Sequence, residues 1–236
     1  IERLAAMREP YADRPRESGR LNYSAERVAQ FVGWAYGTED PIAVHAVGDW
    51  AIETYLAALE KAGPAETWRA KRPRLEHGDM LMPDLIPRAK ALGVVVVQNP
   101  AHFTLRNDLM ARLGPERMQS VQPMKSLLDA GIPIALGSDG PINPYLNILF
   151  ATTHPVNPGE ALSREQAVAA YTSGSAFAEF AERDKGRLVA GALADLAVLS
   201  ADVFTAPPPQ LPGIVSLLTL IGGQPAHDTG LWAGRR

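Results

Sequence analysis

The sequence predicts an α/β fold with a parallel β-sheet at its centre. Short apolar runs bounded by glycine or proline alternate with amphipathic, helix-like segments from about residue 24 to residue 180. This alternation is typical of βαβ units, whose strands lie parallel. In addition, the apolar runs near residues 42 and 133 lead into His45 and Asp139, and the short segment near residue 74 leads into His77. Because α/β enzymes carry their chemistry at the carboxyl ends of parallel strands, the pattern also predicts an active site.

The composition excludes several classes of protein. The chain has 236 residues, a length that suits one large domain or one domain with a small annex, and 46% of them are apolar. With a net charge of -3, the chain lacks the excess of positive charge that binding to nucleic acid or an anionic membrane requires. No apolar run approaches the roughly 20 residues of a membrane span. The opening residues lack the pattern of a secretory signal, so we expect a cytoplasmic protein.

The first elements follow from capping and turn residues. Residues 1–23 carry turn and charge signals without a sustained period and predict an ordered loop. Ser24 is a suitable cap for a helix that Gly37 ends, and its predicted inner face is Val28, Phe31, Val32 and Ala35. Residues 42–46 then predict the first strand of the sheet.

The next two units have the same design. A second helix opens at Gly48-Asp49 and ends at Gly63-Pro64, with an inner face of Ile52, Leu56 and Leu59. Residues 74–77 predict the second strand. A third helix begins at Met82-Pro83-Asp84 and ends at Gly93. The four valines that follow, residues 94–97, predict a third strand, because β-branched side chains favour extended backbone.

The last parallel unit is followed by a change of pattern. Residues 124–130 predict a short helix, and the run 132–136 predicts the strand that leads to Asp139. Ser163 and Gln166 form a capping box for a helix through Tyr171. From Gly186 onward no helical period occurs, so we expect a small β annex from about residue 187, with strands at residues 193–199 and 214–221.

Three strand ends offer metal-binding side chains, namely His45, His77 and Asp139. Since the carboxyl ends of parallel strands meet at one edge of a sheet, these side chains are expected to converge. Neutral imidazole and carboxylate suit zinc and related divalent ions, and the chain has no cysteine to serve instead. Asp139 is also a candidate proton acceptor for a metal-activated water. The structural alternatives are a core histidine at position 45 and a turn aspartate at position 139.

Other polar residues near these ends have simpler interpretations. Asp49 fits a helix N-cap better than a metal ligand. Glu76 precedes His77 in one strand, so it faces the opposite side and is expected to form an ion pair. Asn99 and His102 follow the valine strand at the same edge of the predicted sheet and are candidates for substrate contact. For His102, an exposed loop position without a functional role is an equal alternative. No phosphate-binding glycine motif and no G-x-S-x-G nucleophile motif is present.

The sequence also resembles a known family. The chain is similar to the amidohydrolase superfamily, in particular the C-terminal half of chains of the amidohydrolase-3 (YtcJ-like) family. The similarity covers residues from about 9 to 200 and lies in a set of ordered motifs: residues 45–51, 74–77, 136–139, 170–174 and 185–188 with 194–196. Family members hydrolyse bonds with metal-activated water in a (β/α)₈ barrel that carries a small β-sandwich. From the residues alone, four strand–helix units are compatible with half of such a barrel or with a complete open sheet.

The resemblance implies a set of roles. Residues 1–186 would form strands five to eight of the barrel, and residues 187–236 would belong to the β-sandwich. His45 and His77 would be metal ligands, and Asp139 would be both ligand and proton acceptor. The metal would be one or two divalent ions, with zinc the first choice. The expected activity is hydrolysis of an amide, N-formyl or cyclic amide C–N bond in a small-molecule substrate.

The chain departs from the family pattern at three points. The His-x-His pair of strand one is absent, and so is the strand-four lysine or glutamate that contacts metal. Ala192 replaces a lysine that is usual in the turn before Ala194-Asp195-Leu196. We therefore expect an N-terminal barrel half as a partner, in the same protein or on a separate chain, and a homo-oligomer is compatible with the sequence. The alternative is a catalytically incomplete remnant that acts as a binding or assembly partner.

Overall fold

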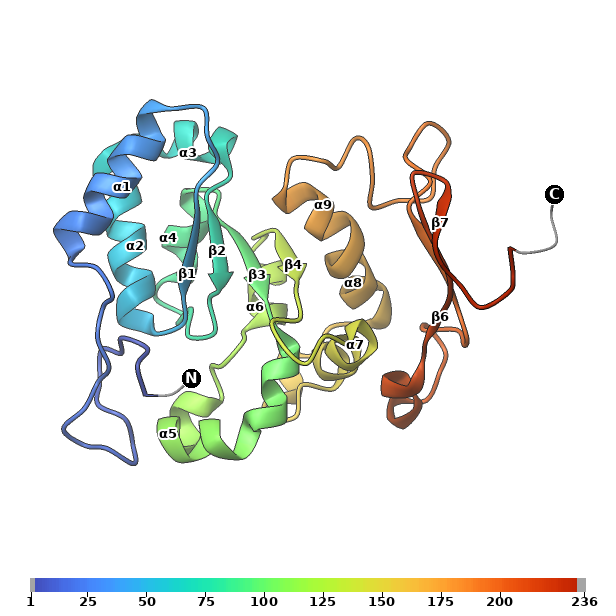
Figure 1. Ribbon diagram of the computed structural model, residues 1–236. Helices are drawn as coiled ribbons and strands as arrows, with labels where there is room; N and C mark the ends of the chain where they lie inside the picture. The colour runs from blue at the N-terminus through green and yellow to red at the C-terminus, as the bar shows by residue number, and fades with distance from the viewer. Residues whose placement is uncertain (1–2, 233–236) are drawn as a thin grey trace.

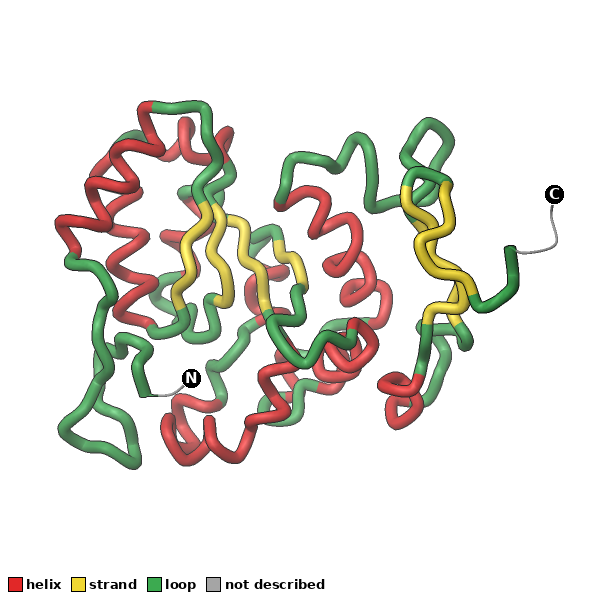
Figure 2. Tube along the Cα trace, viewed as in Figure 1, coloured by secondary structure: helices red, strands yellow, loops and turns green. Residues whose placement is uncertain are grey.

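The computed structural model describes residues 3–232, and its central element is a four-stranded parallel sheet in the order β1-β2-β3-β4 (Figures 1 and 2). The strands are β1 (Ala43–Ala46), β2 (Arg74–His77), β3 (Val95–Gln98) and β4 (Ile134–Leu136). Ala46 lies opposite His77, and Gln98 lies opposite Leu136. The carboxyl ends of neighbouring strands therefore lie at one edge, and the predicted α/β class with a parallel sheet is confirmed.

Helices cover one face of this sheet. Figure 1 shows α1 (Ala25–Gly37), α2 (Asp49–Ala62), α3 (Ala65–Lys71) and α4 (Ile86–Ala91) grouped beside β1 and β2. Alternate strand residues such as Leu75 and Val96 join the main hydrophobic core with these helices. Their neighbours along the strands, including Arg74 and Glu76, project to the opposite face because strand side chains alternate. Among residues 3–232, no helix combines the length and hydropathy that a bilayer crossing requires.

The local signals for helix ends are confirmed at several points. The Ser24 hydroxyl accepts a hydrogen bond from the Arg27 amide, at 3.3 Å. The capping box is complete in α8 (Arg164–Ala169), where Ser163 and Gln166 exchange side-chain and backbone hydrogen bonds. The second helix ends at Ala62, with Gly63 as its C-cap. Each of these signals depends on residues close together in sequence, which is why the sequence alone could place them.

Three predictions about helices are wrong in detail. Phe31 is 37% exposed rather than on the inner face of α1, and its ring stacks edge-on against Tyr23 at 5.3 Å. The third helix begins at Ile86 rather than near Met82, because residues 83–85 form a turn. The helix after Ser163 does not run regularly through Tyr171: it changes to a π-helical turn at Ala170–Gly174 and continues as α9 (Ser175–Ala178).

Several helical segments were not predicted, among them α3, a 3₁₀-helix η1 (Pro100–Leu105), α5 (Arg106–Met118) and α7 (Pro144–Thr153). In α5 the helical geometry is broken at Gly114, whose φ is 77°, just before Pro115. That break disrupts the hydrophobic period on which sequence assignment depends. By contrast, α7 starts with a clear local signal, since the Asn143 side chain accepts hydrogen bonds from the amides of Tyr145 and Leu146. The shorter helix α6 (Met124–Asp129) was predicted and is confirmed.

A second, antiparallel sheet follows in the order β5-β6-β7. Its strands are β5 (Leu196–Leu199), β6 (Ser216–Ile221) and β7 (Gln224–Asp228). The first two are shorter than the predicted segments, and β7 was not predicted. A 3₁₀-helix (Pro208–Gly213) lies between β5 and β6, where no helix was expected. Figure 1 shows α7, α8 and α9 between the two sheets.

The two edges of the parallel sheet differ. At the β4 edge, the Ser175 hydroxyl donates to the carbonyl of Leu136 at 3.4 Å, and Gly174 packs so closely that an added Cβ would lie 2.4 Å from the carbonyl oxygen of Ile134. Along β1, the described residues supply no further strand. Instead, β1 borders a groove of about 910 Å³. The Tyr55 hydroxyl, which belongs to a residue lining this groove, is buried and has no hydrogen-bond partner.

Candidate functional site

The site begins with two residues whose backbone conformation is unusual. His77 is the last residue of β2 and has a φ of 72°, and Asp139, three residues beyond β4, has a φ of 52°. Positive φ is uncommon for residues other than glycine and carries strain that tends to occur at functional sites. Gly78, which follows His77, also has a positive φ, at 62°. The chain thus turns sharply at these strand ends.

Four side chains meet at this edge of the sheet. The ring centroids of His45 and His77 are 4.2 Å apart, and the His77 ring stacks with that of His102 at 5.4 Å. Nε2 of His102 lies 3.1 Å from Oδ2 of Asp139. All four residues line the groove that borders β1. Within the described part of the chain, one group has metal-binding geometry: one donor atom each from His77, His102 and Asp139 lies within 4.8 Å of the others.

The strand-end residues therefore converge as the sequence predicts, with one difference. His45, His77 and Asp139 lie at the same edge of the sheet and line one groove. However, the group whose donor atoms lie within 4.8 Å of one another contains His102 in place of His45. His45 is exposed on the edge strand β1 and contacts the group through its ring packing on His77. His102 lies in η1 and is partly buried, so it is not the exposed loop histidine of the alternative interpretation.

Asn99 has a different place from the one expected. It is 6% exposed, and its backbone carbonyl accepts a hydrogen bond from Nε2 of Gln122 at 3.0 Å. Its side-chain nitrogen would lie 3.0 Å from a Cβ added to Gly137. Asn99 therefore packs beneath the loop that carries Asp139, and it is not among the residues that line the groove.

Burial and neighbouring charges decide the protonation of the site. Burial lowers the pKa of His77, which favours the neutral imidazole that can bind metal. Burial alone also lowers the pKa of His102, but its hydrogen bonds and charge interactions with Asp79 and Asp139 outweigh that effect and raise the pKa above its ordinary value. The hydrogen bond from His102 lowers the pKa of Asp139. Asp139 is therefore an ionised carboxylate at neutral pH.

The donor set fits a divalent metal ion. Nδ1 of His77 is buried and has no hydrogen-bond partner. An unpaired buried polar atom costs about 1–3 kcal/mol, and a bound ligand that engages this imidazole would reduce that cost. Two imidazoles and a carboxylate within 4.8 Å form a nitrogen and oxygen set of the kind that zinc and similar ions bind.

Sequence reasoning missed Asp79, the most deeply buried carboxylate near the site. The residue is 0% exposed, and its Oδ2 lies 3.4 Å from Nδ1 of His102. His102 therefore lies between two carboxylates, Asp79 and Asp139. The available signal was the position of Asp79 two residues after His77, at the same strand end, but an aspartate in such a place usually indicates a turn.

Two further sequence predictions can be judged here. The assignment of Asp49 as an N-cap is wrong, because Gly48 occupies the cap and Asp49 is the first helical residue of α2. Its buried carboxylate accepts hydrogen bonds from the amides of Arg8 and Trp50, both at 2.9 Å, which fixes the N-terminal segment to the helix. The expected ion pair of Glu76 is confirmed, with Arg74 as the partner at 2.5 Å.

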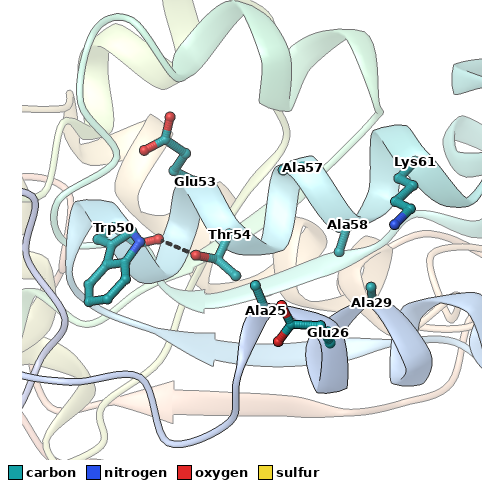
Figure 3. Close-up of a pocket in the computed structure, with 9 residues that line it drawn as sticks. All are labelled: Ala25, Glu26, Ala29, Trp50, Glu53, Thr54, Ala57, Ala58 and Lys61. Atoms are coloured by element: carbon teal, nitrogen blue, oxygen red, sulfur yellow. Dashed lines mark hydrogen bonds between the residues drawn. The ribbon is translucent and has the colours of Figure 1, made fainter.

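A second, smaller groove lies elsewhere on the surface. Figure 3 shows that it runs between α1 and α2, where it is lined by residues such as Ala29, Trp50, Glu53 and Lys61. The hydroxyl of Thr54 donates to the carbonyl of Trp50 at 2.8 Å, so it is already satisfied within the helix. No histidine lines this groove. The potential metal-binding group lies instead at the edge of the sheet.

Comparisons with known proteins show which family the chain resembles. A sequence profile of the amidohydrolase family matches residues 1–227. YtcJ of Bacillus subtilis (strain 168), whose name assigns it to the amidohydrolases, is 32% identical over 96% of this chain and 45% of its own. An N-substituted formamide deformylase of Arthrobacter pascens is 28% identical over 77% of this chain and 35% of its own.

A solved structure extends the comparison to three dimensions. The crystal structure of an uncharacterized metal-dependent hydrolase from Pyrococcus furiosus superposes with a TM-score of 0.70 at 33% identity, covering 80% of this chain and 40% of that one. The chain thus spans less than half the length of each of these three relatives. A profile match that extends over nearly the whole sequence, together with these similarities, shows that the chain belongs to the amidohydrolase family.

Proposed function

We propose that this chain is part of a metal-dependent hydrolase that cleaves an amide, N-formyl or cyclic amide C–N bond of a small molecule. The observation that carries the proposal is the meeting of His45, His77, His102 and Asp139 at one edge of the sheet in a chain of the amidohydrolase family. The His45 and His77 rings are 4.2 Å apart, and donor atoms of His77, His102 and Asp139 lie within 4.8 Å of one another. The similarity to an N-substituted formamide deformylase supports a C–N bond as the target. Several bonds of this type remain compatible with the site, because fold and family do not determine the substrate.

In this proposal His45, His77 and Asp139 hold the metal, with one or two divalent ions and zinc as the first choice. When bound, a divalent ion lowers the pKa of water toward about 7 and polarises the substrate carbonyl. The neutral state of His77, favoured by its burial, is the form that can donate a lone pair. The position of His45 against the His77 ring makes it available to the same ion.

The chain's own residues would handle the protons. Asp139, ionised and exposed to the groove, accepts the proton of the attacking water at Oδ2. It then passes that proton to the departing amine nitrogen as the C–N bond breaks, leaving a carboxylic acid and an amine, which become a carboxylate and an ammonium group when the second proton of the water is transferred. His102 holds Asp139 by a hydrogen bond at 3.1 Å and is positioned to contact substrate. Asp79, on the other side of the ring, orients His102.

The proposed architecture rests on the same family assignment. We infer that residues 1–186 form the second half of a (β/α)₈ barrel and that residues 187–236 belong to a small β-sandwich. A completing segment, in the same protein or on a separate chain, would supply the other strands and the His-x-His ligands. The support is the β1 edge, which borders a groove of about 910 Å³ and has no neighbouring strand within the described residues. The protein is proposed to act in the cytoplasm, and assembly of several copies is compatible with this arrangement.

A second candidate function is a binding or assembly subunit without catalysis. The hydrogen bonds of His102 to Asp79 and Asp139 favour it, because they satisfy this histidine without a metal. The two functions differ in metal affinity, because an enzyme should hold about one or two ions per site and a remnant should hold none tightly.

Hydrolysis of model substrates is the direct test of the hydrolase. The complete enzyme would be loaded with zinc and incubated with N-benzylformamide, N-acetylbenzylamine and a hydantoin, and the products quantified by mass spectrometry. We expect hydrolysis of at least one of these classes, with loss on chelation and in Asp139→Asn. A loaded protein that hydrolyses none of the three classes, or an Asp139→Asn variant with full turnover, would overturn the proposal.

A further inference from the structure

A single buried amide, that of Asn147 in α7, connects the loops that carry His102 and Asp139. Asn147 is 0% exposed. Its Oδ1 accepts a hydrogen bond from the backbone amide of Ala101 at 2.8 Å. Its Nδ2 donates to the Ser138 hydroxyl at 3.1 Å and to the Asn143 carbonyl at 3.0 Å. Both hydrogens of the amide nitrogen and one lone pair of its oxygen are therefore used.

The partners of this amide directly precede the two site residues in sequence. Ala101 comes before His102, and Ser138 comes before Asp139. The Ser138 hydroxyl is also 2.7 Å from the Tyr171 hydroxyl, which fixes it from a second direction. Asn147 thus joins two loops that start from different strands, β3 and β4, at positions adjacent to their functional side chains.

The orientation of the amide is unambiguous. A backbone N–H can only donate, so Oδ1 must face Ala101, and a carbonyl can only accept, so Nδ2 must face Asn143. Aspartate would place an acceptor, and a buried charge, against the Asn143 carbonyl. Leucine would fill a similar volume but would leave the Ala101 amide without a partner. Neither substitution can reproduce the connection.

We propose that Asn147 is a positioning residue that sets the separation between Nε2 of His102 and Oδ2 of Asp139. That separation is 3.1 Å, and Asn147 contacts neither side chain by a hydrogen bond. Asp139 has a φ of 52°, a conformation that surrounding contacts must maintain. The connection through Ser138 supplies one such contact. The kinetic consequence of this role rests on the proposed hydrolase function, whereas the geometric consequence does not.

The geometric consequence can be measured without turnover. The ring resonances of His102 in protein labelled with ¹⁵N-histidine report its hydrogen bonds to the flanking carboxylates. We expect these resonances to shift in Asn147→Leu toward their positions in Asp139→Asn. The matched control is Ile148→Ala, which removes buried apolar packing from the next position of the same helix and should leave the His102 resonances in place. Unchanged His102 resonances in Asn147→Leu would overturn the positioning role.

The kinetic consequence separates positioning from general destabilisation. In the complete enzyme, Asn147→Leu should lower kcat by about 10- to 100-fold, because a misplacement near 1 Å has an effect of this size. KM should change much less than kcat, because proton transfer by Asp139 depends on its position more strongly than ground-state binding does. Ile148→Ala should retain kcat, because among the described residues Ile148 makes no hydrogen bond to either loop. In a double-mutant cycle, Asn147→Leu should have little further effect once His102→Ala is present.

The two proposals fail in different ways. Losses of kcat that multiply in the double variant would overturn the positioning role while leaving the hydrolase intact. If the loaded wild-type enzyme hydrolyses nothing, the hydrolase proposal fails, and the His102 resonances alone decide the role of Asn147.

Discussion

Nε2 of His102 lies 3.1 Å from Oδ2 of Asp139, although 37 positions separate the two residues in sequence. The adjacent parallel strands β3 and β4 place their carboxyl ends side by side, with Gln98 opposite Leu136. The loops beyond these ends then turn toward each other. His77, from the neighbouring strand β2, completes a group of donors with the spacing of a metal site.

Asp139→Asn should abolish turnover without unfolding the protein. Removal of a general base lowers the rate by about 10²- to 10⁴-fold. The side chain is 55% exposed, so the substitution should leave the circular dichroism spectrum and the melting temperature close to those of the wild type. Steady-state rates with the substrate identified in the hydrolysis assay check this prediction, and wild-type kcat in the variant would remove Asp139 from the mechanism.

A buried histidine outside the metal-binding group should make stability depend on pH. His154 is 0% exposed, its Nδ1 accepts the Asn157 amide at 3.0 Å, and its Nε2 faces the carbonyls of Val121 and Gln122. Burial lowers the pKa of His154, so the folded state binds a proton less readily than the unfolded chain. Its contribution is complete above the unfolded pKa of about 6.5 and decreases as the pH falls below that value.

Urea unfolding at pH 7.5 and pH 5.5 measures this effect. The wild type should be less stable at the lower pH, with a contribution from this histidine of at most about 1.4 kcal/mol per pH unit. His154→Asn keeps a side chain that tolerates positive φ and should reduce the pH dependence. His227→Asn, at an exposed position of β7, should retain the wild-type dependence. Equal slopes for the wild type and His154→Asn would contradict the assignment.

The part of the site that the sequence could predict depends on local patterns. Short apolar runs lead to His45 and Asp139, and a third short segment leads to His77. A parallel sheet must bring the carboxyl ends of these strands to one edge. The direct contact between His102 and Asp139 could not be predicted, because it depends on the path of two loops.

The supporting polar residues were missed for a related reason. Asp79 and Asn147 have the same appearance in sequence as exposed turn or helix residues. Their burial comes from contacts with segments 23 and 46 positions away. Helix α5 was missed because Gly114 and Pro115 interrupt its period, whereas the capping box at Ser163 was found because it is complete within four residues.

Two glycine substitutions should have opposite effects on stability. An added Cβ at Gly174 would lie 2.4 Å from the Ile134 carbonyl oxygen, whereas one at Gly33 in α1 would meet nothing within 4 Å. Gly174→Ala should therefore destabilise the protein by about 1–3 kcal/mol through overpacking. Gly33→Ala should stabilise it by up to about 1 kcal/mol, because alanine is the better helix former. Thermal unfolding of both variants checks the pair, and a melting temperature raised by Gly174→Ala would contradict the close packing at the β4 edge.

The central claim is that the strand-end histidines and Asp139 hold a divalent metal, and metal content tests it most directly. The complete enzyme would be equilibrated with zinc, dialysed extensively, and analysed by inductively coupled plasma mass spectrometry alongside His77→Ala and the exposed control His227→Ala. We expect about one or two zinc ions per wild-type chain, the same content in His227→Ala, and at least one ion fewer in His77→Ala. A wild type that retains no zinc, or a His77→Ala variant with the full wild-type content, would contradict the account.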